Sequence, residues 1–175
     1  VATTLPKALK EVEFGEYPAV KQVLDALPAN GQLHVANSMA IRYVNFLGRR
    51  TQEICCNRGT SGIDGSNSTA VGASLISQEP VTLLTGDMAF FYDRNAFWHN
   101  YPMPNLRVIV LNNHAGGIFR LIDGPARQPE LEEFFETKQA LNVKSLASEY
   151  GFHYASVTTS EELESALVKF YEPSL

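Results

Sequence analysis

Val81-Thr-Leu-Leu-Thr-Gly-Asp87 and Leu106-Arg-Val-Ile-Val-Leu-Asn-Asn113 are the two stretches that decide the fold of this chain. In each of them an apolar run of strand length stops abruptly at polar residues. Such runs are typical of strands that are buried on both faces of a parallel sheet, and we expect Leu106–Leu111 to be a central strand. A helix is expected between them, over Phe91–His99. The order strand, helix, strand predicts an α/β fold with a mainly parallel sheet.

The same alternation of helices and strands extends on both sides of this unit. The further elements that we expect are a helix over Tyr17–Leu27, a strand over Gln32–Ala36, a helix that starts at Asn37-Ser38 and ends at Gly48, a strand over Ile54–Cys56, a helix around Ala70–Ala73, a strand over His153–Val157 and a helix over Glu161–Tyr171. Asp64 and Ser160 are expected to cap the helices that follow them. Residues 1–16 show no clear period and are expected to be a linker, so the predicted domain covers residues 17–175.

Composition excludes several classes of protein. The 175 residues are 45% hydrophobic and 19% charged, which is enough apolar material for one domain with a buried core. The net charge of −5 argues against nucleic-acid binding, which needs a basic surface. No apolar stretch approaches the length of a membrane span. The two cysteines, Cys55 and Cys56, are adjacent, so a disulfide framework is excluded and a cytoplasmic location is expected.

Polar residues follow the two decisive strands, at Gly86-Asp87 and Asn112-Asn113, with 24 residues between the two pairs. Ligands of open parallel sheets bind outside the carboxyl ends of the strands, where Asp87 and one asparagine would converge. Carboxylate and amide oxygens suit Mg²⁺. This ion usually has few protein ligands and completes its coordination shell with water and phosphate oxygens. The glycines at 86, 116 and 117 would let phosphates approach the backbone. The sequence therefore indicates a metal and phosphate site.

Other interpretations of these residues stay open at this level. Gly86-Asp87 is also a common turn and Asn112-Asn113 a common loop. An aspartate-based phosphatase or a phosphate-binding receiver domain would show a similar pattern. A phosphatase nucleophile usually lies in a denser cluster of aspartates than Asp87 does, so we rank that possibility lower.

The spacing of these pairs resembles the thiamine-diphosphate signature, Gly-Asp-Gly followed at a similar distance by Asn-Asn, although Met88 replaces the third glycine. The flanking sequences narrow the resemblance. They are Asn37-Ser-Met-Ala-Ile-Arg42, Arg58-Gly-Thr-Ser-Gly-Ile-Asp-Gly65, Gly86-Asp-Met-Ala-Phe-Phe-Tyr-Asp93 and Asn112-Asn-His-Ala-Gly-Gly-Ile-Phe119. Together they resemble the C-terminal pyrophosphate (PP) domain of the SEPHCHC synthases of menaquinone biosynthesis. The resemblance implies the thiamine-diphosphate-binding fold, with helices on both faces of the sheet.

The resemblance also implies a cofactor site for thiamine diphosphate. It implies that Asp87, the Asn113 side chain and the Ala115 carbonyl hold Mg²⁺, with Mn²⁺ as an alternative; the family usually has glycine at position 115. Ile63 would be the wedge that bends the cofactor, so that the cofactor's own 4′-imino nitrogen can deprotonate its thiazolium carbon. The residues implied to line the cofactor are Asn37, Ser38, Ser61, Gly62, Ile63, Gly86, Met88, Ala89, Gly116 and Gly117.

The implied reaction is a transferase reaction that decarboxylates 2-oxoglutarate and adds the succinyl semialdehyde unit to isochorismate, giving SEPHCHC. Both substrates are acids with two carboxylates, which favours guanidinium groups in the site. The residues implied to contact substrate are Ser38, Arg42, Arg58, Ile118, Phe119 and Leu121.

The resemblance further implies partners outside this chain. The N-terminal pyrimidine-binding domain and the middle domain of the family have no counterpart here, and the activating glutamate lies on that N-terminal domain. No catalytic residue is therefore expected in this chain, which would be inactive alone. Its partner would be the N-terminal domain of a second subunit, in a homodimer or homotetramer. The alternatives are another thiamine-dependent decarboxylase, an acetolactate-synthase-like enzyme or a non-catalytic cofactor-binding module.

Overall fold

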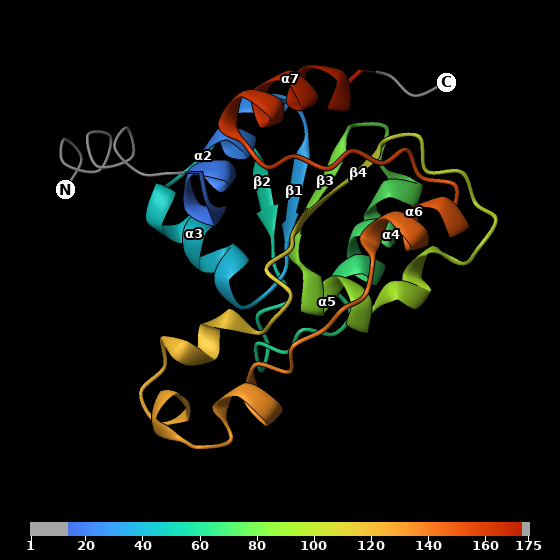
Figure 1. Cartoon of the computed structure of the whole chain (residues 1–175). Coiled ribbons are helices and arrows are strands. Elements are labelled where there is room, and N and C mark those ends of the chain that lie inside the picture. Colours follow the sequence, from blue (N-terminus) through green and yellow to red (C-terminus); the bar gives the residue numbers. More distant parts are fainter. Residues whose placement is uncertain (1–13, 173–175) are drawn as a thin grey trace.

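A four-stranded parallel sheet lies at the centre of the computed structural model, which describes residues 14–172 (Figure 1). The strand order is β2-β1-β3-β4, and all neighbouring strands are parallel. The strands are β1 (Gln32–Val35), β2 (Glu53–Cys55), β3 (Val81–Gly86) and β4 (Leu106–Leu111). The predicted α/β fold with a parallel sheet is therefore confirmed.

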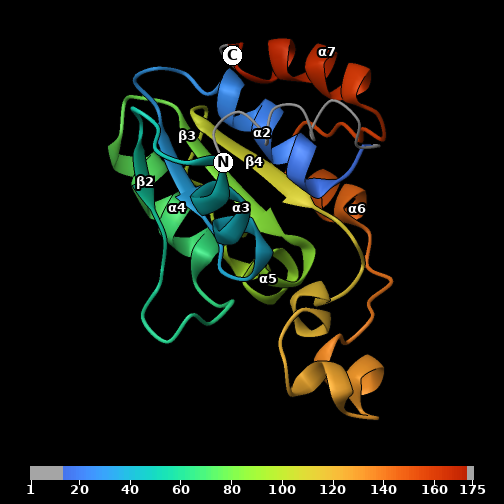
Figure 2. The same ribbon diagram turned by 90° about the vertical axis from the view of Figure 1, so that its left-hand side faces the viewer.

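Helices cover both faces of the sheet, as Figures 1 and 2 show. One face carries α2 (Glu16–Ala26), α3 (Met39–Leu47) and α7 (Ser160–Phe170), and the other carries α4 (Ser66–Ile76), α5 (Asp87–Tyr92) and α6 (Val143–Glu149). The alternation of side chains along a strand explains the two cores. Leu84 packs in the first and its neighbour Leu83 in the second.

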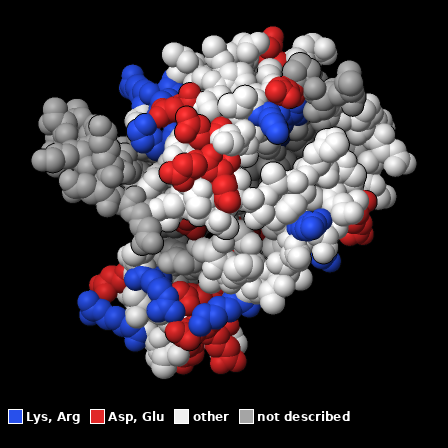
Figure 3. Space-filling view, turned by 45° about the horizontal axis from the view of Figure 1, so that its top comes forward, with Lys and Arg blue, Asp and Glu red and all other residues white. Residues whose placement is uncertain are grey.

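A small lobe of short helices lies beyond the carboxyl end of β4, at the lower end of Figure 1. We define the lobe as Gly117–Lys138. It contains the short helices η2 (Gly117–Arg120), η3 (Pro125–Arg127) and η4 (Leu131–Phe135). Arg120 ties the lobe together through ion pairs to Glu132, at 3.0 Å, and to the buried Glu136. Figure 3 shows basic and acidic side chains mixed at this end of the molecule.

The helix expected over Phe91–His99 is wrong in its limits. The helix α5 begins at Asp87, directly after β3, and ends at Tyr92; a separate short helix, η1, covers Arg94–Phe97. An aspartate in the first turn is favourable at the positive end of the helix dipole, so the chain turns into a helix at once. The first turn of α5 thereby brings Asp87 to the edge of the sheet.

Two expectations about strands are also wrong. Within the described residues β4 lies at the edge of the sheet, not in its centre. The segment His153–Val157 forms no strand there, although it reads as one. The packing at its two ends explains this. Phe152, just before the segment, packs into the core on the α5 face, and Val157, its last residue, packs into the core between α2 and α7. The segment therefore crosses from one face to the other instead of running along β4.

The predicted helix caps differ from those observed. Gly65, in the left-handed conformation, precedes α4 in the place expected for Asp64, and Thr159 rather than Ser160 caps α7 by accepting a hydrogen bond from the backbone N–H of Glu162. Ser38 directly precedes α3, but its side chain makes no capping bond. Residues 1–13 of the expected linker lie outside the described residues. In the part of the chain that is described, no helix is long and apolar enough to cross a membrane.

Candidate active site

A cavity of about 430 Å³ opens at the carboxyl ends of β1, β3 and β4. All of the residues that the sequence singles out for cofactor and metal binding line it. The lining includes Asn37, Ser38, Ser61, Gly62, Ile63, Gly86, Asp87, Met88, Ala89, Asn113, Ala115, Gly116, Gly117 and Phe119. The topology thus brings four separate segments of the sequence to one place, as expected for a parallel sheet.

Asp87 is one of two buried carboxylates that line this cavity, with 2% of its surface exposed; the other, Glu136, is paired with Arg120. Among the described residues its one hydrogen-bond partner is the side-chain amide of Gln139, whose Nε2 lies 2.7 Å from Oδ2. The same Nε2 lies 3.4 Å from Oδ1 of Asn112. A buried carboxylate that meets only a neutral amide is costly, because a buried charge is stable when a cation balances it.

Asn113 lies opposite, in the loop after β4. Its Nδ2 donates to Oε1 of Glu16 at 2.9 Å, and its Oδ1 accepts from the backbone N–H of Ala115 at 3.0 Å. The other oxygen of Glu16 accepts from the Tyr43 hydroxyl at 2.8 Å. Burial of the Tyr43 hydroxyl, and then its hydrogen bond to the Glu16 carboxylate, raise the pKa of Tyr43 well above its usual value.

Asn37 organises the loop after β2. Its buried amide donates to the carbonyls of Asn57 and Gly62, at 2.6 and 2.7 Å, and its Oδ1 accepts from Arg58 at 2.7 Å. A Cβ at position 62 would meet the exposed carboxylate of Asp64, which would have to move aside. The Asn37 side chain therefore shapes the wall of the cavity that carries Ser61, Gly62 and Ile63.

Backbone strain is concentrated at this site. Among the described residues, the non-glycine residues with a positive φ are Ser38, Ser61, His114 and Thr137, and all but His114 line the cavity. Such conformations cost free energy and persist where the surroundings hold them, which is common at functional sites.

The two departures from the thiamine signature are tolerated. Met88 lies in the first turn of α5 and Ala115 in the loop after β4, and neither has a positive φ, so neither position requires glycine. Gly116 is different, because a Cβ there would lie 3.2 Å from the carbonyl oxygen of Phe135. Its N–H donates to the carbonyl of Glu136 at 2.7 Å, so the lobe packs directly on this loop.

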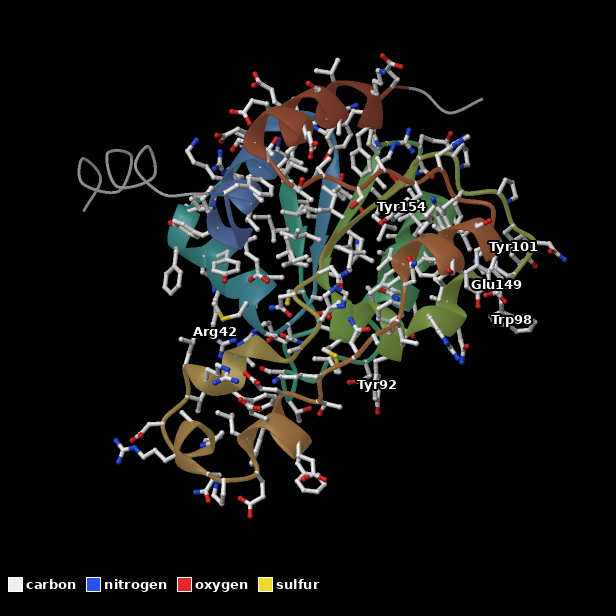
Figure 4. The ribbon with its side chains drawn as sticks, in the orientation of Figure 1. Arg42, Tyr92, Trp98, Tyr101, Glu149 and Tyr154 are labelled. Carbon is white, nitrogen blue, oxygen red and sulfur yellow. The ribbon has the colours of Figure 1, made fainter. Side chains whose placement is uncertain are left out.

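The residues implied to contact substrate are more scattered. Ser38 and Phe119 line the cavity, whereas Arg42, Arg58, Ile118 and Leu121 do not. Arg42, labelled in Figure 4, is half-buried and donates to the Ser38 carbonyl at 2.8 Å. Ile118 is buried within the lobe, and Leu121 is 70% exposed.

Several lining or contacting residues were missed by sequence reasoning. Glu16 falls in the stretch without a clear period, and Gln139 follows a lobe whose sequence shows no recognisable motif. The other missed lining residues are Met39, Ala40, Leu111, Phe134, Phe135, Glu136 and Thr137. Met39, Ala40 and Leu111 lie within stretches that the sequence singles out, but no signal marks the lobe residues, because tertiary contacts alone bring the lobe to the cavity.

The donor set at this edge fits a divalent metal bound together with a phosphate. Asp87 supplies one buried carboxylate that has no cationic partner in the described part of the chain, and Asn113 and Ala115, which line the same cavity, offer a neutral amide oxygen and a carbonyl oxygen. No cluster of three acidic, histidine or cysteine side chains that could hold a metal occurs among the described residues. A site with so few protein ligands suits Mg²⁺, which keeps water and phosphate oxygens in its coordination shell.

Comparison with known proteins defines the class to which this fold and site belong. Residues 36–174 match the family "Thiamine pyrophosphate enzyme, C-terminal TPP binding domain", and the chain belongs to that family. The structure of a benzoylformate decarboxylase from Polynucleobacter necessarius has the same fold. Its TM-score is 0.70, at 16% identity, over 87% of this chain and 30% of that chain.

Three curated relatives with high identity to this chain are 2-succinyl-5-enolpyruvyl-6-hydroxy-3-cyclohexene-1-carboxylate (SEPHCHC) synthases. The chain is 55% identical to that of Cytophaga hutchinsonii over 168 residues, 44% to that of Christiangramia forsetii and 40% to that of Bacteroides fragilis. These matches cover 94–95% of this chain but only 29–30% of the relatives' length. The resemblance stated from the motifs is thus confirmed, and this chain corresponds to one part of those enzymes.

Proposed function

We propose that this chain is the cofactor-binding domain of an SEPHCHC synthase. The full-length enzyme would be a transferase of menaquinone biosynthesis that decarboxylates 2-oxoglutarate and joins the remaining four-carbon unit to isochorismate. The observation that carries the proposal is the buried carboxylate of Asp87, which has no cationic side-chain partner among the described residues and lines one cavity with Asn113 and Ala115. The identity of 55% to a named synthase supports this reaction among those of thiamine enzymes.

In this proposal the strand ends hold the cofactor. Asp87, Asn113 and the Ala115 carbonyl would bind Mg²⁺ or Mn²⁺, and backbone groups of Met88, Ala89, Gly116 and Gly117 would surround the diphosphate. Bound thiamine diphosphate would supply the carbanion and the electron sink that the reaction needs. The protein would then contribute orientation, for which the rigid first turn of α5 and the strained Ser38 and Ser61 are suited.

The substrates would be recognised at the rim of the cavity. Arg42 and Arg58 do not line the cavity, but each uses one guanidinium nitrogen to bond a lining residue, Ser38 and Asn37 respectively. This leaves other N–H groups for the carboxylates of the substrates. Phe119 packs on Phe135 with 5.5 Å between ring centroids, and both line the cavity. These rings would exclude water from the carbon that forms the new bond.

The proposal includes a partner. Because the chain spans about 30% of the relatives' length, the activating glutamate would come from the N-terminal domain of a second subunit. The domain alone would then bind the cofactor weakly and turn over no substrate.

The test is an assay of the full-length protein with thiamine diphosphate, Mg²⁺, 2-oxoglutarate and isochorismate, in which the ultraviolet absorbance of isochorismate is followed. We expect loss of isochorismate that requires all four small molecules. Release of carbon dioxide from another 2-oxo acid, with no loss of isochorismate, would assign the chain to a different thiamine enzyme. Cofactor binding without any turnover would indicate a non-catalytic binding module.

A further inference from the structure

Glu16 touches the proposed metal site, although it lies 97 residues from Asn113 in the sequence. It is the first residue of α2 and lines the cavity. Its two oxygens have different partners. One accepts from the Asn113 amide at 2.9 Å, and the other accepts from the Tyr43 hydroxyl at 2.8 Å. The carboxylate thereby connects α2 and α3 to the loop after β4.

The Asn113 amide is useful to a cation in only one orientation. Its Oδ1 can act as a ligand, whereas its Nδ2 would repel a cation. An asparagine side chain can turn over and exchange the two ends unless its hydrogen bonds forbid it. A carboxylate can only accept and the Ala115 N–H can only donate, so their contacts with Asn113 are compatible with one orientation.

The surroundings keep Glu16 in place. Tyr43 packs against Tyr17, with 5.7 Å between ring centroids, and its hydroxyl points at the Glu16 carboxylate. Gly117 leaves room for the amide, because a Cβ there would lie 3.3 Å from the Asn113 Nδ2. The neighbours on both sides of the Glu16–Asn113 hydrogen bond thus leave little freedom for another arrangement.

We propose that Glu16 is a positioning residue of the metal site, which fixes the Asn113 amide with its oxygen toward the cation. This inference rests on the proposed function and adds to it a residue outside the thiamine signature. Partners that orient a metal ligand typically change metal affinity by about 10–100-fold when they are removed.

The experiment measures Mn²⁺ affinity in the full-length protein, by the electron paramagnetic resonance signal of free Mn²⁺, with thiamine diphosphate present. Glu16→Leu is expected to weaken Mn²⁺ binding by about 10–100-fold. Glu161→Leu is the matched control, since Glu161 is an exposed acidic residue in the first turn of α7. The control should keep the affinity of the unmodified protein.

A second background separates positioning from simple loss of structure. Asn113→Asp replaces the amide by a carboxylate with two equivalent oxygens, so the side chain presents an oxygen to the cation in either orientation. Glu16→Leu should therefore weaken Mn²⁺ binding much less in the Asn113→Asp protein than in the unmodified protein. Where Glu16→Leu fails to fold, Glu16→Gln takes its place in both backgrounds, because its amide can pair with either orientation of Asn113.

Two results would overturn the role of Glu16. One is a Glu16→Leu protein that binds Mn²⁺ as tightly as the unmodified protein, and the other is a loss of affinity that is equally large in the unmodified and the Asn113→Asp backgrounds. An unmodified protein that binds neither Mn²⁺ nor thiamine diphosphate would instead contradict the proposed function, and the role of Glu16 would fall with it.

Discussion

At the scale of single residues, the environment of the Asp87 carboxylate is the main support for a metal site. Its side chain is buried, and its hydrogen-bond partner among the described residues is the neutral amide of Gln139. The burial of a charge without a counter-charge is stable in few settings, and a bound cation is one of them. This environment distinguishes Asp87 from an exposed turn residue, which the pair Gly86-Asp87 equally permits.

Asp87→Ala in the full-length protein should abolish Mg²⁺-dependent binding of thiamine diphosphate, because it removes the one anionic ligand from the proposed metal set. Isothermal titration calorimetry with and without Mg²⁺ measures this effect. Asp123→Ala is the control, since Asp123 is an exposed aspartate of the lobe that pairs with Arg127. Cofactor affinity unchanged by Asp87→Ala would remove the metal assignment.

Gln139→Leu should destabilise the protein when metal and cofactor are absent. It leaves the buried Asp87 carboxylate without its hydrogen bond, which costs about 1.5–3 kcal/mol for a charged group. With Mg²⁺ and thiamine diphosphate present the loss should shrink, since the cation then balances the charge. Thermal unfolding under both conditions measures the difference. Gln128→Leu, an exposed glutamine of the lobe, is the control, and equal losses under both conditions would contradict the explanation.

At the scale of elements, the sequence predicts strands better than the segments that join them. The strands at Val81–Gly86 and Leu106–Leu111 follow directly from their apolar runs. β3 is almost wholly buried, whereas β4, at the edge of the sheet in the described residues, is mostly half-buried. The helix after Gly86 begins earlier than its apolar residues suggest. Its start is favoured by the interaction of Asp87 with the helix dipole, and a pattern of apolar residues does not reveal that interaction. The segment at His153–Val157 has the composition of a strand, but anchors on opposite faces of the sheet prevent pairing.

The same reasoning separates the parts of the site. Motifs in the loops after β1, β2, β3 and β4 indicate most of the cavity lining, because the topology of a parallel sheet brings those loops together. Motifs do not predict Glu16 or Gln139. Glu16 lies 97 residues from its partner Asn113 in the sequence, and Gln139 lies 52 residues from its partner Asp87. Their roles depend on where α2 and the lobe pack, and no local pattern encodes that.

The start of α3 gives a prediction about strain. Ser38, with a φ of 72°, adopts a conformation that serine disfavours at a cost of about 1–3 kcal/mol. Ser38→Gly should relieve part of this strain and stabilise the first turn of α3 by about 1 kcal/mol, after the greater freedom of glycine in the unfolded chain is counted. Hydrogen–deuterium exchange of that turn in the full-length protein should therefore slow by about fivefold. Unchanged or faster exchange would show that the Ser38 backbone is not under strain.

At the scale of the whole molecule, the side near α5 and α6 exposes large aromatic rings, which Figure 4 labels. Tyr92, Trp98 and Tyr101 are 71%, 75% and 68% exposed. Exposed aromatic surface of this kind is typical of a face that contacts another protein surface. It is consistent with a chain that spans about 30% of the relatives' length.

The chain of residues 1–175 should therefore self-associate when it is separated from the rest of the enzyme, and Trp98→Ser together with Tyr101→Ser should reduce this association. Sedimentation velocity over a range of concentrations measures it. Val168→Ser, which removes an apolar side chain of similar exposure on α7, is the control. A chain that stays monomeric, or a control that reduces association equally, would contradict the assignment of this face.

The most direct test of the account is a crystal structure of the full-length protein with Mn²⁺ and thiamine diphosphate, with the anomalous signal of manganese used to locate the metal. We predict one Mn²⁺ bound by Asp87, the Asn113 side chain and the Ala115 carbonyl, with the diphosphate beside Gly116 and Gly117. A manganese peak elsewhere, or a cofactor bound away from this cavity, would contradict the central claim that these strand ends form the cofactor site.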